Sequence, residues 1–254
     1  MKQIERDTLF TQKPDVQRTL IAQQLNSSTT EQLNTFPVII QPMIVISDMM
    51  GTLTTCSPIL GLLDWIKVHQ SKAQARWLLA SMMPSYLLVK LGLIDPQPWG
   101  QGLMVKSLTW LKDMDEEKFA QACEWAVEHN LWLKRREDVI TRLTTHAQEG
   151  AQVYIASSVV QPIADAFARR IGVQAIGSPV QIVGGKVRLV DGLVKSERKI
   201  QEVLQRLQVE QVDYAYGDTF MDIPLLENAV HPVAVYPDRR LEETAREKGW
   251  EIVA

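Results

Sequence analysis

The stretch MIVISDMMGTLT, residues 43–54, decides how this sequence is interpreted. Its first four residues form a short apolar run after Pro42, which predicts a buried β-strand. Asp48 then falls at the carboxyl end of that strand, which is where open parallel sheets gather their ligands. The residue two positions later, where a partner acid would stand, is Met50. The stretch therefore predicts a functional site that has a single carboxylate from this loop.

Length and composition indicate a globular protein with a full core. The chain has 254 residues, of which 46% are hydrophobic, enough for one large domain or for a domain with an insertion. Its formal net charge is −3 and its pI is about 5.9, so we expect no sequence-independent binding to the phosphates of nucleic acid. The predicted partner is a small molecule or another protein, and the oligomeric state stays open.

Two features bear on the cellular compartment. Cys56 and Cys123 lack metal-site spacing and are too few for a disulfide framework, which favours a reducing environment. The first ten residues show no apolar secretory segment, so a cytoplasmic location is expected. The apolar stretch 77–94 contains Pro84 and Lys90, and we expect it to be buried or interfacial, with no transmembrane segment.

The periodicity divides the chain into three parts. Residues 1–36 are rich in Gln, Thr, Ser and Asn and predict an N-terminal arm that could be flexible, with a short amphipathic helix at 16–25. Residues 57–146 are helical in pattern, with breaks at Pro84, Asp95-Pro96 and Asp113, where Asp113 and Glu116 resemble a helix N-cap. Residues 37–56 and 147–254 complete an α/β core.

Strands and helices alternate through the second part of that core. Strands are predicted at 153–157, 213–218, 232–236 and 250–253, with a hairpin near 180–190 and helices between them. One strand, a long helical excursion and then the remaining strands indicate an α/β fold. We expect a doubly wound, Rossmann-like parallel sheet with an inserted all-helical cap domain.

Three carboxylates at two strand ends predict a magnesium site. Asp48 follows the first strand, and Asp218 follows the strand DYAYG, with Asp222 one helical turn later. Mg²⁺ prefers oxygen ligands and needs only a few from the protein. Gly217 is expected to permit a tight turn there. In isolation, the alternative that Asp218 is a helix N-cap and Asp222 a solvated residue would be favoured.

Two further polar residues are predicted near the same edge of the sheet. Ser157 ends the strand VYIAS, where it could bind phosphate with the N–H groups of the next helix, although Ser157 or Ser158 could equally be an N-cap. Lys199 opens a predicted helix and could neutralise phosphate, with a plain surface lysine as the alternative and Lys195 as a competitor.

The ordered set DMMGTLT, Ser157, Lys199 and GDTFMD resembles the motifs of haloacid-dehalogenase superfamily phosphohydrolases. The helical segment directly after the first motif, and the tail 216–253, are similar to the phosphoserine-phosphatase-like branch, subfamily IB. The resemblance covers about residues 43–254. It implies a Mg²⁺-dependent hydrolase, a phosphatase acting on a small phosphorylated substrate.

The resemblance also implies a role for each matching residue. Asp48 would be the nucleophile that forms an aspartyl-phosphate. The Met50 carbonyl, Asp48 and Asp218 would bind Mg²⁺, with Asp222 as a ligand or as an orienter of Lys199. The phosphoryl group would be held by a set of polar groups: Gly51, Thr52, Ser157, Ser158 and Lys199.

Met50 departs from the family pattern, because family phosphatases usually have an aspartate there as general acid and base. Such assistance is typically worth ~10²–10⁴ in rate, so a slow or specialised phosphohydrolase is expected. One alternative is phosphonate cleavage through a cap lysine, for which the chain offers Lys67, Lys72, Lys90 and Lys106. Another is a pseudoenzyme that binds a phosphorylated ligand or a protein partner. Metal-free dehalogenation is disfavoured by Asp218 and Asp222.

The predicted cap is rich in tryptophan. Core packing is the favoured interpretation of these residues, and the alternative is an apolar surface for a lipid-like phosphate or a membrane interface. The six are Trp65, Trp77, Trp99, Trp110, Trp125 and Trp132.

Overall fold

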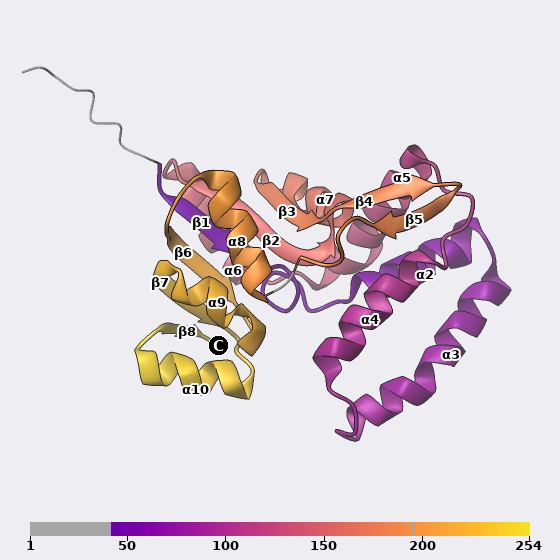
Figure 1. Ribbon diagram of the computed structural model, residues 1–254, viewed down its shortest axis with the longest axis horizontal. Helices are drawn as coiled ribbons and strands as arrows, with labels where there is room; N and C mark the ends of the chain where they lie inside the picture. Colours follow the sequence, from indigo (N-terminus) through magenta and orange to yellow (C-terminus); the bar gives the residue numbers. More distant parts are fainter. Residues whose placement is uncertain (1–41, 195) are drawn as a thin grey trace, which may run out of the picture. The chain divides into compact units, whose positions relative to one another are not determined.

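The computed structural model describes residues 42–194 and 196–254. The predicted N-terminal arm and Lys195 lie outside the described residues. A six-stranded sheet has the order β3-β2-β1-β6-β7-β8, and every neighbouring pair is parallel (Figure 1). Its strands are β1 (Ile44–Ser47), β2 (Gln152–Val160), β3 (Gln174–Ser178), β6 (Val212–Gly217), β7 (Ala229–Val235) and β8 (Glu251–Val253).

Helices cover both faces of this sheet, because alternate strand residues point to opposite sides. Val45 packs in one core with residues of α6 (Glu137–Gln148) and α7 (Gln161–Ile171). Ile46 packs in the other core with residues of α8 (Ser196–Leu207), α9 (Ile223–Glu227) and α10 (Arg239–Lys248). The predicted doubly wound parallel sheet is confirmed.

The segment between β1 and β2 is helical, as predicted. It comprises α2 (Pro58–His69), α3 (Lys72–Lys90), α4 (Pro96–Leu108), α5 (Glu116–Ala126), the π-helix η1 (Val127–Leu131), the 3₁₀-helix η2 (Trp132–Lys134) and α6. Figure 1 shows α3 and α4 extending beyond the sheet. The residue boundaries of the cap stay a prediction.

Two predicted helix boundaries in this segment are wrong. Pro84 does not end a helix but lies inside α3, where its ring is exposed to solvent. The N-cap of α5 is Asp115, whose carboxylate accepts a hydrogen bond from the Lys118 N–H at 2.8 Å. Asp113 instead lies within the preceding loop and has a φ of 51°, in the left-handed region.

The second sequence-predicted strand is longer than expected. β2 continues through Ser157 to Val160 and changes register against β3 between Ala156 and Val160. Helix α7 therefore begins at Gln161, after an N-cap at Val160. The predicted hairpin is present as an antiparallel pair, β4 (Val180–Val183) and β5 (Lys186–Leu189).

The tryptophans of the helical segment divide between core and surface. Trp65 and Trp110 are buried, in agreement with core packing, whereas Trp77 on α3 is 68% exposed. Helix α3 thus carries an apolar surface that core packing does not explain. Within the described residues, no helix combines the length and apolarity that crossing a bilayer requires.

Candidate active site

The loop that follows β1 is held in one conformation by backbone hydrogen bonds. The Asp48 N–H donates to the Tyr216 carbonyl at 2.8 Å, which ties the loop to β6. Gly51 has a φ of +90°, and a Cβ at this position would lie 1.8 Å from Oδ2 of Asp218. Glycine is therefore required at position 51 both by the backbone and by the close approach of Asp218.

Asp218 and Asp222 lie where β6 ends and the 3₁₀-helix η3 (Phe220–Asp222) begins. Thr219 is the N-cap of η3, and the Asp222 carboxylate accepts the Thr219 N–H at 3.3 Å, which completes a capping box. A Cβ on Gly217 would lie 2.5 Å from the Cβ of Asp222, and its φ is not positive. Gly217 is needed for this close approach, not for the tight turn that the sequence predicted.

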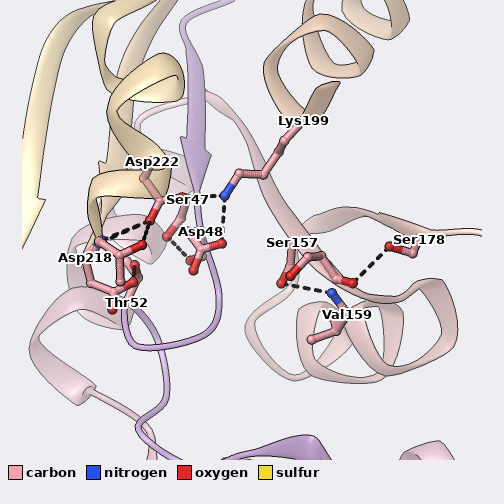
Figure 2. Close-up of polar contacts among 11 residues, drawn as sticks. Ser47, Asp48, Thr52, Ser157, Val159, Ser178, Lys199, Asp218 and Asp222 are labelled. Atoms are coloured by element: carbon pink, nitrogen blue, oxygen red, sulfur yellow. Dashed lines mark hydrogen bonds and ion pairs between the residues drawn. The ribbon is translucent and has the colours of Figure 1, made fainter. Parts of the chain in front are cut away.

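The three carboxylates converge, and Lys199 bridges two of them. One oxygen of each of Asp48, Asp218 and Asp222 lies within 4.8 Å of the others. The Lys199 Nζ donates to Asp48 Oδ1 at 2.8 Å and to Asp222 Oδ1 at 2.5 Å (Figure 2). Asp222 and Lys199 are each 4% exposed, so the alternatives of a solvated acid and a surface lysine are wrong.

The electrostatics of this cluster favour an additional cation. Burial raises the pKa of Asp48 to about 7, and nearby Asp222 adds to the increase while Lys199 opposes it. Burial also raises the pKa of Asp218 to about 8, with Asp48 and Asp222 adding to it. Burial alone would lower the pKa of Lys199, but the two carboxylates outweigh it and keep that pKa above its ordinary value. Three acids and one lysine leave negative charge unbalanced, and an all-oxygen donor set fits Mg²⁺.

Two of the hydroxyl groups predicted to hold phosphate, those of Thr52 and Ser157, have other partners in this structure. Thr52 Oγ1 donates to Asp218 Oδ1 at 3.0 Å. Ser157 is fully buried within β2, and its Oγ accepts the Val159 N–H at 3.4 Å, so it is not a helix N-cap. The Ser158 backbone carbonyl accepts from the Ser178 hydroxyl at 2.9 Å. Their phosphate-binding roles stay predictions.

One residue beside the site was missed by sequence reasoning. The Arg136 Nε donates to the Gly51 carbonyl at 2.8 Å, and its guanidinium lies 3.8 Å above the Tyr236 ring. Arg136 thereby supports the loop that carries Asp48. It is separated from Gly51 by 85 positions, and no local pattern in the sequence signals the contact.

Comparison with known proteins agrees with this geometry. The family described as haloacid dehalogenase-like hydrolase matches residues 45–227, which is more than half of the chain. The chain belongs to the haloacid dehalogenase-like hydrolases. A phosphoserine phosphatase of Mycobacterium tuberculosis is 32% identical to this hydrolase over 133 residues, 50% of this chain and 42% of the relative. A histidinol-phosphatase of Neisseria meningitidis is 32% identical over 120 residues, 43% of this chain and 54% of the relative.

Solved structures share the fold of this haloacid dehalogenase-like hydrolase. A Bordetella pertussis protein of unknown function superimposes with a TM-score of 0.68 at 19% identity, over 84% of this chain and 98% of that one. A substrate-bound phosphoserine phosphatase gives 0.55 at 15% identity, over 84% and 93%. These likenesses show the fold alone. The chain spans about half the length of the curated relatives it matches.

Proposed function

We propose that this protein is a Mg²⁺-dependent phosphomonoesterase that acts through an aspartyl-phosphate on Asp48. The observation that carries the proposal is the buried cluster of Asp48, Asp218 and Asp222, with Lys199 bonded to two of its members. Phosphoryl transfer depends mainly on positioning and on neutralising charge, and this cluster supplies both. The matched phosphatases of other organisms support the same reaction class.

In this proposal, Mg²⁺ is held by Asp48, Asp218, the Met50 carbonyl and Asp222. When bound, the ion neutralises phosphate charge and polarises the phosphoryl oxygens. Asp218 is already oriented by the Thr52 hydroxyl at 3.0 Å, and Asp222 by the capping box. The acids are thus held in place by neighbours that are not themselves ligands.

The chain's own groups account for the bond changes. An Asp48 carboxylate oxygen attacks phosphorus, the bond between phosphorus and the ester oxygen breaks, and the ester oxygen leaves with the electron pair and takes a proton from solvent to give the alcohol. Lys199, 2.8 Å from Asp48, favours the ionised carboxylate against the effect of burial and, with Gly51, Thr52, Ser157 and Ser158, would contact the phosphoryl oxygens. Water then cleaves the aspartyl-phosphate and releases phosphate.

Met50 limits this sequence of steps, because its thioether can neither protonate the departing alcohol nor activate the attacking water. We therefore propose a slow or specialised enzyme, in which a substrate with a good leaving group or a proton from another source replaces the missing acid. A lipid-like substrate is considered for this site, and because its alkyl alcohol is a poor leaving group, its cleavage would depend on a proton from another source. A cytoplasmic location stays a prediction from cysteine usage.

The phosphonate-cleaving alternative is less well supported. It requires a cap lysine at the reaction centre, and Lys67, Lys72, Lys90 and Lys106 are all exposed to solvent. Lys67 is instead paired with Asp64 at 3.1 Å. The pseudoenzyme alternative is separated from the proposal by the following experiment.

Hydrolysis of p-nitrophenyl phosphate and of unactivated alkyl phosphates should be measured with Mg²⁺ and with excess chelator. We expect turnover of the activated ester that needs Mg²⁺ and disappears in Asp48→Asn. Asp165→Asn, an isosteric change at an acid on α7, should keep the wild-type rate. Absence of turnover in the wild type, together with Mg²⁺-dependent binding of inorganic phosphate, would contradict the proposal in favour of a pseudoenzyme.

A further inference from the structure

A cavity of about 520 Å³ adjoins the loop that carries Asp48. Met50, two residues after Asp48, lines it together with Ser158 and Val159, the residues that directly follow Ser157. Helices α2, α3 and α4 supply most of the remaining wall, and Ser57 and Leu193 complete it. The two chain segments that carry the proposed nucleophile and the proposed phosphate-binding serine therefore also form part of this cavity.

The lining of the cavity is mostly apolar, with Ser57, Gln101 and Ser158 as polar, uncharged members. Among the described residues that line it, none has a charged side chain. Met82, Trp99, Leu103 and Met104 are representative of its apolar wall, and Tyr86 stands 6.2 Å from Trp99, measured between ring centroids. A zwitterionic substrate such as an amino-acid phosphate would need charged partners for its ammonium and carboxylate groups. This cavity offers a hydrocarbon chain a far better environment than it offers such a substrate.

We propose that the cavity binds the apolar chain of an amphiphilic phosphomonoester whose phosphate is held at Asp48. The inference rests on the proposed function, and it names the substrate class of the same site. Met50 then contributes an unbranched thioether that packs against the first carbons of the chain, in place of an acid that would be costly to bury beside them.

The outer wall of the cavity gives such a chain a way in. Leu79 and Met83 of α3 line the cavity and are also 47% and 51% exposed. Their apolar side chains thus face both solvent and cavity. Further along the same helix, Leu87 is 57% exposed, so the apolar surface continues beyond the cavity mouth. A chain that enters past α3 would remain in contact with apolar groups.

A homologous series of substrates tests the inference. Ethyl, butyl, hexyl, octyl and decyl phosphate should be compared with wild-type protein, below the concentrations at which they form micelles. Burial of one methylene corresponds to ~0.8 kcal/mol, so we expect kcat/KM to rise about fourfold per methylene and to level off once the cavity is filled. Equal kcat/KM across the series would overturn the inference while leaving the phosphomonoesterase proposal intact.

Two glycines of α4 provide a matched pair of variants. Gly100 lines the cavity and Gly102 does not, and at both positions an added Cβ would meet no atom within 4 Å. Gly100→Trp should fill the cavity and lower kcat/KM for octyl phosphate by at least about tenfold. Gly102→Trp should keep the wild-type dependence on chain length. Equal behaviour of the two variants would contradict the assigned position of the chain.

Binding of n-alkylphosphonates, in which a carbon–phosphorus bond replaces the hydrolysable ester bond, separates this inference from the proposed function. Calorimetry should show affinity that rises with chain length in the wild type and in Gly102→Trp, but not in Gly100→Trp. If no ester is turned over and this binding pattern is still found, the cavity assignment stands and the phosphomonoesterase proposal fails. Affinity that is independent of chain length would overturn the inference.

Discussion

Met50 stands at the position where a proton-transferring acid would complete the proposed phosphate-ester hydrolysis. Its side chain lines an apolar cavity, so its surroundings suit a hydrocarbon better than a carboxylate. The neighbouring acids Asp48, Asp218 and Asp222 nevertheless remain clustered. The acid cluster that we propose to bind the metal thus persists without the residue that would assist the leaving group.

Restoring an acid at this position should restore catalysis of unactivated esters. We expect Met50→Asp to raise kcat for ethyl phosphate by at least about tenfold, since general acid–base assistance is typically worth ~10²–10⁴. Steady-state kinetics of Met50→Asp and of Met50→Asn, which adds polarity but no titratable group, would check this. A gain of equal size in the asparagine variant would contradict the explanation.

Substitution of Gly51 should affect both the stability of the protein and the geometry of the acid cluster. Gly51→Ala forces an alanine to a φ of +90° and places its Cβ against Asp218, so both stability and the acid cluster should suffer. Gly150→Ala is the matched control, because Gly150 has a φ of +93° and open space around its Cβ.

Chemical denaturation and activity assays would separate the two effects of these alanine substitutions. Gly150→Ala should lower the free energy of unfolding by about 1–2 kcal/mol, with unchanged activity. Gly51→Ala should lower it further and reduce activity by at least about tenfold, because Asp218 must move. Wild-type activity in Gly51→Ala would contradict the described contact.

The acids of the cluster are easier to predict from the sequence than the residues that orient them. Strand ends in a parallel sheet share one edge, so Asp48 and Asp218 could be expected to meet. Lys199 was one of two candidates, and only the packing of α8 shows that its amine reaches Asp48 and Asp222. The contact of Arg136 with Gly51 depends on tertiary structure and has no sequence signature.

At the scale of helices and strands, the errors came from residues whose local preference suggested that an element ends. Ser157 and Ser158 read as the end of a strand, but tertiary pairing carries β2 on to Val160, which pairs with Ser178 of β3. Pro84 read as a helix end, yet α3 continues past it. Both cases show tertiary context overriding a local preference.

Helix α5 offers a test of its corrected start. Asp115→Ala should lower the free energy of unfolding by about 1 kcal/mol, because it removes the hydrogen bond to the Lys118 N–H. Asp113→Gly should be neutral or stabilising, because Asp113 has a φ of 51° that glycine adopts freely. Urea denaturation of both variants would check this, and a larger loss in Asp113→Gly would contradict the assigned cap.

Across the whole described molecule, most of the order of elements was predictable, but the edge strand β3 (Gln174–Ser178) was not predicted, and neither were the surfaces. A strand, a long helical segment and alternating strands and helices fixed the doubly wound topology, because parallel strands need helical crossovers. Periodicity does not say which helical residues face a neighbour and which face solvent. The exposed face of α3 and the cavity beside Met50 therefore emerge only from the assembled structure.

The proposed mechanism requires that one divalent ion is held by Asp48 together with Asp218 and Asp222, which lie in two distant parts of the chain. Isothermal titration calorimetry of Mg²⁺ into the wild type, Asp218→Asn and the control Asp165→Asn tests this most directly. We predict one site per chain in the wild type and in Asp165→Asn, and binding weakened at least about tenfold in Asp218→Asn. Equal Mg²⁺ affinity in all three proteins, or none in the wild type, would contradict it.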